Sequence, residues 1–120
     1  MRHKTTHKDF LYFSERVKHW VQKLGLTGYE VTLGHSDLKE EVLACIRVDL
    51  FGKGAYFILG KNWGADAVTK TDLDRTAFHE VIHLLLYAYQ DVVDRRLPEI
   101  DVSMSEHGII RRLENMVFGI

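Results

Sequence analysis

The spacing of apolar residues near the start of the chain predicts an amphipathic helix over residues 9–24. The apolar side chains recur at every third or fourth position, which is the spacing of one helix face. Gly25 follows the last of them, and glycine commonly stands just beyond a helix end. The members of this stripe are Phe10, Phe13, Val17, Trp20, Val21 and Leu24.

Three runs rich in β-branched and aromatic residues come next and predict strands. They cover residues 29–35, 42–50 and 55–60, with polar or glycine-bearing turns between them. The turn Phe51-Gly52-Lys53-Gly54 is the clearest hairpin signal in the chain. We therefore expect a three-stranded, mostly antiparallel sheet.

Two further helices are predicted in the C-terminal half. The first is apolar on most sides, which is typical of a buried helix, and the hydroxyl of Thr71 is its predicted N-cap. Pro98 discourages helix in residues 91–102, and a second, amphipathic helix is predicted over residues 103–120. Its apolar stripe consists of Ile109, Ile110, Leu113, Val117 and Ile120. This order of elements predicts an α+β fold in one domain, residues 1–120.

Composition narrows the class of protein without naming a function. With 46% hydrophobic and 28% charged residues the chain is an ordinary globular protein. A net charge of -1 gives no electrostatic reason to expect nucleic acid or an anionic membrane as partner. Cys45 is the only cysteine, which excludes an internal disulfide and a zinc site built from several thiolates. No apolar run reaches membrane-spanning length and no signal-type segment follows the N-terminus, so we expect a cytoplasmic protein.

One short pattern, His79-Glu80-Val81-Ile82-His83, adds candidate chemistry to the buried helix. Two histidines four residues apart lie on one face of a helix, a geometry that suits two ligands of Zn²⁺. Glu80 would flank the metal, where it can accept a proton from a water activated by the metal. The simplest alternative is a core helix whose histidines are hydrogen-bonded to backbone carbonyls. A capped, buried helix favours the zinc interpretation because polar residues inside it need partners.

A zinc site needs a third protein ligand, and the last predicted helix offers two candidates. At about 100° per residue, Glu106 falls within about 20° of the centre of the apolar stripe, whereas His107 lies about 120° from it. A carboxylate among aliphatic side chains needs a cation, so Glu106 is the predicted third ligand beside His79 and His83. His107 is the alternative ligand, and its position also suits an accessory proton donor.

These two stretches resemble the zincin metallopeptidases of the gluzincin type, in which a glutamate on a later helix completes the H-E-x-x-H site. They are also similar to small stand-alone proteins of phage and prophage genomes that are assigned as metallopeptidases and carry an acid-led helix with an R-L-E-N-like run, here residues 106–115. The resemblance implies a minimal zincin-like fold, zinc-dependent hydrolysis of a peptide or protein substrate, and Glu80 as general base. Thermolysin-type gluzincins carry an aspartate four residues after the ligand glutamate that orients a histidine. Ile110 stands at that position here, and Asp72 is our candidate for the orienting role.

The resemblance also places residues 54–60 at the edge of the sheet, beside the cleft, where an extended substrate could pair with the strand. An ordinary core strand fits this run equally well. Two other functions compete with the peptidase: a non-catalytic protein-binding module with a structural zinc site, and a metal-free domain with a buried polar network. Glu80 favours catalysis, because a purely structural site has no use for a carboxylate beside an open coordination position.

Overall fold

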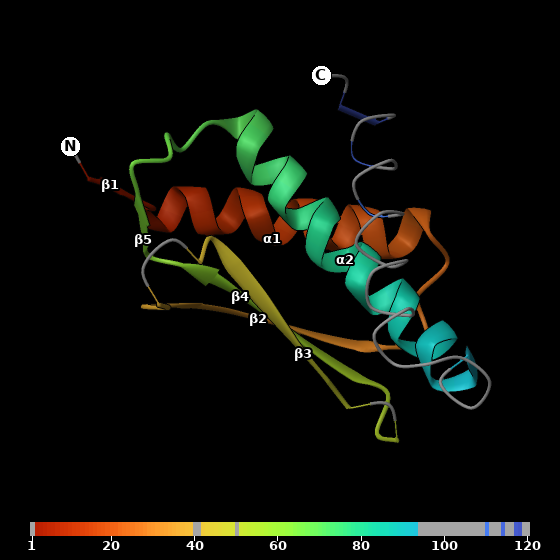
Figure 1. The fold of residues 1–120 in the computed structure, drawn as a ribbon. Coiled ribbons are helices and arrows are strands. Elements are labelled where there is room, and N and C mark those ends of the chain that lie inside the picture. The colour runs from red at the N-terminus through yellow and green to blue at the C-terminus, as the bar shows by residue number, and fades with distance from the viewer. Residues whose placement is uncertain are drawn as a thin grey trace.

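The computed structural model describes residues 2–39, 42–49 and 51–93, with the backbone alone for residues 88–93, and four helical residues nearer the C-terminus (Figure 1). Those four are Ile110, Glu114, Val117 and Phe118. The elements are β1 (His3–Lys4), α1 (His7–Lys23), β2 (Glu30–Ser36), β3 (Ala44–Asp49), β4 (Gly54–Gly60), β5 (Asn62–Gly64) and α2 (Lys70–Val93). The predicted α+β class is confirmed. Within the described residues, no helix combines the length and the apolar character needed to cross a membrane.

The main sheet has the order β2-β4-β3, so β4 is its central strand. β4 pairs antiparallel with β3 and parallel with β2. The prediction of a mostly antiparallel sheet was therefore wrong for one of the two pairings, because β3 lies at the far edge and β4 returns between it and β2. The placement of residues 54–60 at the sheet edge was also wrong. Their near-continuous apolar run suits a strand with neighbours on both sides.

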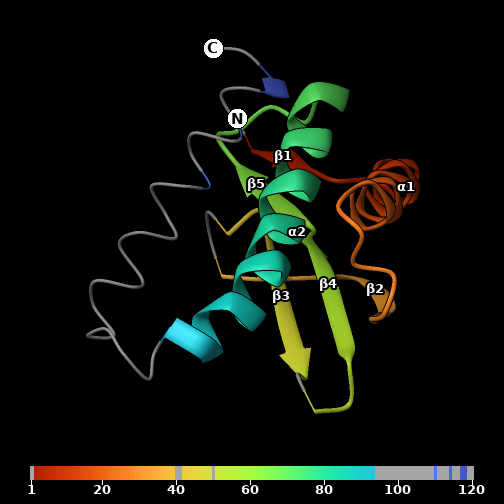
Figure 2. The same ribbon diagram turned by 90° about the vertical axis from the view of Figure 1, so that its right-hand side faces the viewer.

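Both helices cover the same face of this sheet (Figures 1 and 2). Helix α1 begins after a capping box, in which Asp9 N–H donates to the Thr6 hydroxyl and Thr6 N–H donates to the Asp9 carboxylate. The main core joins the inner faces of α1, β4 and α2. It contains Phe13, Val17 and Val21 of α1, Ala55, Phe57 and Leu59 of β4, and Leu73, Ala77, Val81 and Leu84 of α2, together with Trp63. The short strands β1 and β5 form a second, antiparallel sheet, too short for the residue pattern to indicate.

Helix α2 starts at Lys70, earlier than predicted, and it is capped by Thr69 instead of Thr71. Asp72 N–H donates to the Thr69 hydroxyl over 3.1 Å, and that hydroxyl donates to the Asp72 carboxylate over 2.7 Å. Two residues further along, Asp74 accepts hydrogen bonds at one carboxylate oxygen from Arg16 Nε (2.8 Å) and Trp20 Nε1 (2.7 Å) of α1. These bonds fix α2 against α1 just before the H-E-x-x-H sequence.

The described C-terminal residues pack on α2 through a face that differs from the predicted stripe. Ile110 is fully buried, as expected, and it lies in a second apolar cluster with Phe78 and Ile82. Val117, by contrast, is 46% exposed. The contacting side chains are four residues apart and include Phe118, whose ring lies edge-on to Phe78. The predicted stripe counted only aliphatic residues and so missed the aromatic anchor.

Candidate metal site

The two histidines of the motif face each other on α2, as their spacing predicts. Their Nε2 atoms are 3.2 Å apart. Two nitrogen ligands of one tetrahedral zinc ion, each about 2.05 Å from the metal, stand about 3.3 Å apart. The separation of His79 and His83 is therefore compatible with a shared zinc ion, and it is also that of a hydrogen bond between the two rings.

The other ring nitrogen of His79 contacts a residue that the sequence did not single out. Nδ1 of His79 lies 2.5 Å from a carboxylate oxygen of Glu114. Only 15% of the Glu114 side chain and 35% of the His79 side chain are exposed. Asp72, our candidate for orienting a histidine, is instead engaged in the cap of α2, and Glu114 is the acid that contacts His79. The signal in the sequence was an acid spaced four residues from Ile110 and from Phe118.

Glu80 is buried in α2, with 8% of its surface exposed. Burial, and secondarily the nearby Glu114 carboxylate, raise the pKa of Glu80 to about 8. Both causes disfavour the ionised form, and a cation close to the carboxyl would oppose them.

A cavity of about 310 Å³ opens beside these groups. Its walls come from the start of β3, from α2 and from the C-terminal helical residues. The lining residues are Val42, Leu43, Ala44, Arg75, Thr76, His79, Glu80 and Glu114. The cavity thus places the general base candidate and one histidine next to an edge strand of the sheet.

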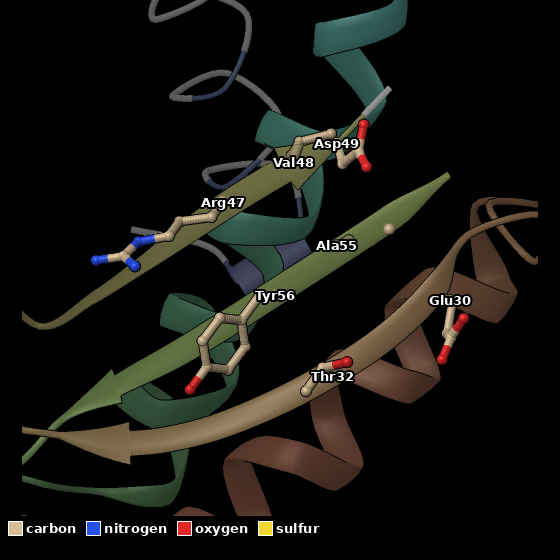
Figure 3. A pocket seen from close by; sticks show the side chains of 8 residues that line it. Glu30, Thr32, Arg47, Val48, Asp49, Ala55 and Tyr56 are labelled. Carbon is tan, nitrogen blue, oxygen red and sulfur yellow. The ribbon is translucent and has the colours of Figure 1, made fainter. Parts of the chain in front are cut away.

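A second cavity of about 320 Å³ lies on the sheet face that carries no helix (Figure 3). Tyr56 fits there because Gly34, on the neighbouring strand, has no side chain: a Cβ at Gly34 would lie 2.4 Å from the Tyr56 hydroxyl. The charged residues around this cavity, Glu30, Arg47 and Asp49, are exposed to solvent. Although slightly larger, this cavity is lined by no histidine and no buried acid, so the candidate catalytic groups line the cavity beside Glu80.

The predicted third ligand, Glu106, and its alternative, His107, lie outside the described residues. Within the described part of the chain, no group of three or more His, Cys, Asp or Glu side chains is arranged to hold a metal ion. The described donors for zinc are thus the two histidines of α2. None of the protein-family models, curated proteins or solved structures compared with this chain matches it.

Proposed function

We propose that this protein is a zinc-dependent metallopeptidase of the cytoplasm that hydrolyses peptide bonds. His79, His83 and Glu106 would hold the metal, and Glu80 would act as general base. The observation that carries the proposal is the pair of imidazole nitrogens 3.2 Å apart, next to a buried carboxyl and an open cavity. The donors fit zinc, because imidazole and carboxylate are its usual ligands in hydrolases.

Bound zinc would supply Lewis acidity and lower the pKa of water to about 7. The protein contributes the proton transfers. Glu80 accepts a proton from the attacking water and then delivers it to the leaving amine. Its burial limits the contact of Glu80 with bulk solvent, and a metal ion held by the histidine pair would favour the ionised carboxylate that a base needs.

The cavity also has a feature that suits a peptide substrate. β3 is an edge strand, and its first residue, Ala44, lines the cavity. Gly60 N–H donates to the Leu43 carbonyl, so the backbone groups of Leu43 point toward β4. Because this direction alternates along an antiparallel pair, the backbone groups of Ala44 and Ile46 point away from β4. An extended peptide added at this edge would lie beside α2 and bind through its backbone groups, without selection for its side chains. The proposed substrate is therefore a peptide or protein segment in extended form, and no nucleic acid.

The substitution Glu80→Gln tests the proposal. It removes the base while keeping the shape of the side chain, so zinc content should stay near one equivalent and hydrolysis should fall by at least about 100-fold. Zinc is measured by elemental analysis, and hydrolysis with dye-labelled unfolded casein and a fluorogenic peptide library. Glu15→Gln, at an exposed position of α1, is the matched control and should behave as wild type.

Two results would contradict the proposal. If the wild-type protein takes up no zinc on titration, the metal site itself is wrong. If zinc is bound but neither the wild type nor Glu80→Gln cleaves any substrate, the protein is a binding module with a structural zinc ion.

A further inference from the structure

We infer that Glu114 is a positioning residue for the metal site, one that fixes the tautomer and ring orientation of His79. This inference rests on the proposed function, since it concerns the same site. Nothing in the H-E-x-x-H pattern identifies Glu114, which lies 35 residues from His79 along the chain. The contact between its carboxylate and His79 Nδ1 carries the argument.

The position of the contact on the ring determines what it does. A neutral imidazole has one N–H, and a carboxylate accepts hydrogen bonds but does not donate them. Glu114 therefore holds the hydrogen on Nδ1 of His79, and Nε2 keeps its lone pair, which can accept a hydrogen bond from His83 or bind a metal. That Nε2 atom is the one that faces Nε2 of His83. Glu114 thus stabilises the form of His79 that can bind a metal at the shared position.

The packing around Glu114 prevents it from turning away. Ile110 and Phe118 stand one helical turn before and after it, and both lie in the apolar cluster with Phe78 of α2. The rings of Phe118 and Phe78 are 5.6 Å apart between centroids, and Ile110 is fully buried. Rotating this segment to remove Glu114 from His79 would expose these apolar side chains to water.

A direct role of Glu114 as a zinc ligand fits the geometry less well. Its oxygen lies against Nδ1, on the side of the His79 ring opposite to the nitrogen that faces His83. A side chain that binds the zinc ion directly would have to lie near Nε2 of His79. The arrangement is instead that of a carboxylate behind a ligand histidine, which raises the basicity of the ring and sets its direction.

The test combines the ring tautomer with zinc affinity in wild type, Glu114→Ala, Glu114→Gln and the control Glu15→Gln. Ring ¹⁵N chemical shifts of the metal-free proteins report which nitrogen of His79 carries hydrogen. Zinc affinity is measured by competition with a chromophoric chelator, and the melting temperature of each metal-free variant confirms folding. We expect the Nδ1–H form in wild type and a loss of zinc affinity of about 10-fold to 100-fold in Glu114→Ala. Glu114→Gln, whose amide oxygen still accepts the Nδ1–H, should keep the tautomer and lose less affinity.

The outcomes separate this inference from the proposed function. Zinc binding by wild type with an unchanged tautomer and unchanged affinity in Glu114→Ala would overturn the inference alone. Complete loss of zinc from both Glu114 variants would also overturn it, because it would make Glu114 a ligand. Failure of the wild type to bind zinc would overturn the proposed function as well. If Glu114→Ala does not fold, Glu114→Met, which fills the same space without accepting a hydrogen bond from Nδ1–H, replaces it in the same two measurements.

Discussion

His35 shows how the surroundings of a side chain can favour one of its protonation states. The Thr5 hydroxyl donates to the Gly60 carbonyl over 2.8 Å, so its oxygen is left to accept from Nε2–H of His35 at 2.7 Å. Burial, followed by the positive charge of Lys61, lowers the pKa of His35 below its ordinary value. The folded protein therefore prefers the neutral ring.

This preference predicts a pH dependence of stability. Because the pKa of His35 is lower in the folded than in the unfolded chain, the stabilisation is present above about pH 6.5 and is lost as the pH falls below it. Unfolding free energies of the zinc-free protein, measured in urea between pH 8 and pH 5, should drop less for His35→Gln than for wild type. His19→Gln, at an exposed position of α1, is the control. Parallel losses in wild type and His35→Gln would show that His35 is not the group responsible.

At the scale of single residues, local spacing was enough to predict part of the site. The pairing of His79 with His83 follows from helix periodicity alone, and the structure confirms it. Glu114 could not be found in that way, because its partner belongs to another element. The angular argument also misjudged Val117, since a helix presents its buried face to whatever packs on it.

Among the elements, the central strand β4 constrains the wall of the candidate site. At the end of β4, a Cβ built on Gly60 would lie 2.7 Å from the Val42 carbonyl oxygen and 3.0 Å from that of Leu43. Both are backbone atoms, and both residues line the cavity next to Glu80. The absence of a side chain at Gly60 thus allows the start of β3 to approach β4.

Gly60→Ala should therefore be costly although it adds only one methyl group. We expect a loss of about 1–3 kcal/mol in the free energy of unfolding, because backbone atoms have to move to accept the methyl group. Urea unfolding measures this loss. Gly28→Ala is the matched control, since a Cβ there meets no atom within 4 Å, and its effect should stay within about 0.5 kcal/mol. Equal stability of the two variants would show that the strand ends adapt freely.

The hairpin between β3 and β4 was readable from its turn, whereas the order of the strands was not. A turn is a local feature, and the glycines of residues 51–54 mark it directly. The parallel pairing of β2 with β4 depends on whether β3 or β4 is placed beside β2, and no local residue pattern determines this. The apolar run of residues 55–59 was the one available sign of a central strand.

In the whole molecule, the candidate site is built from three segments that are distant in the sequence: residues 42–44, residues 75–83 of α2, and Glu114. Helix α1 supplies no lining residue, but it holds α2 in place through Asp74. The α+β class was predictable from the order of patterns along the chain. The convergence of these segments was not, because it depends on long-range packing.

The identity of the third ligand depends on whether Glu106 or His107 faces the two histidines of α2. From the sequence we expect Glu106→Ala to lower zinc affinity by orders of magnitude and to lower the melting temperature of the zinc-loaded protein. His107→Ala should retain the metal. Zinc titrations followed by melting curves on both variants measure this. The exposure of Val117 makes the comparison decisive, because the choice of Glu106 assumed a stripe that includes Val117. Loss of zinc from His107→Ala alone would define a three-histidine site.

The 35-residue separation between His79 and Glu114 sets an order of events during synthesis of the chain. The two histidines come together as soon as α2 forms, since they are one turn apart. The carboxylate that holds His79 arrives only after residue 114 has left the ribosome and packed on α2. On the proposed reading, a nascent chain thus carries a weak, incompletely oriented metal site. On the proposed function, we expect full zinc affinity, and with it hydrolysis, only after Glu114 has packed on α2.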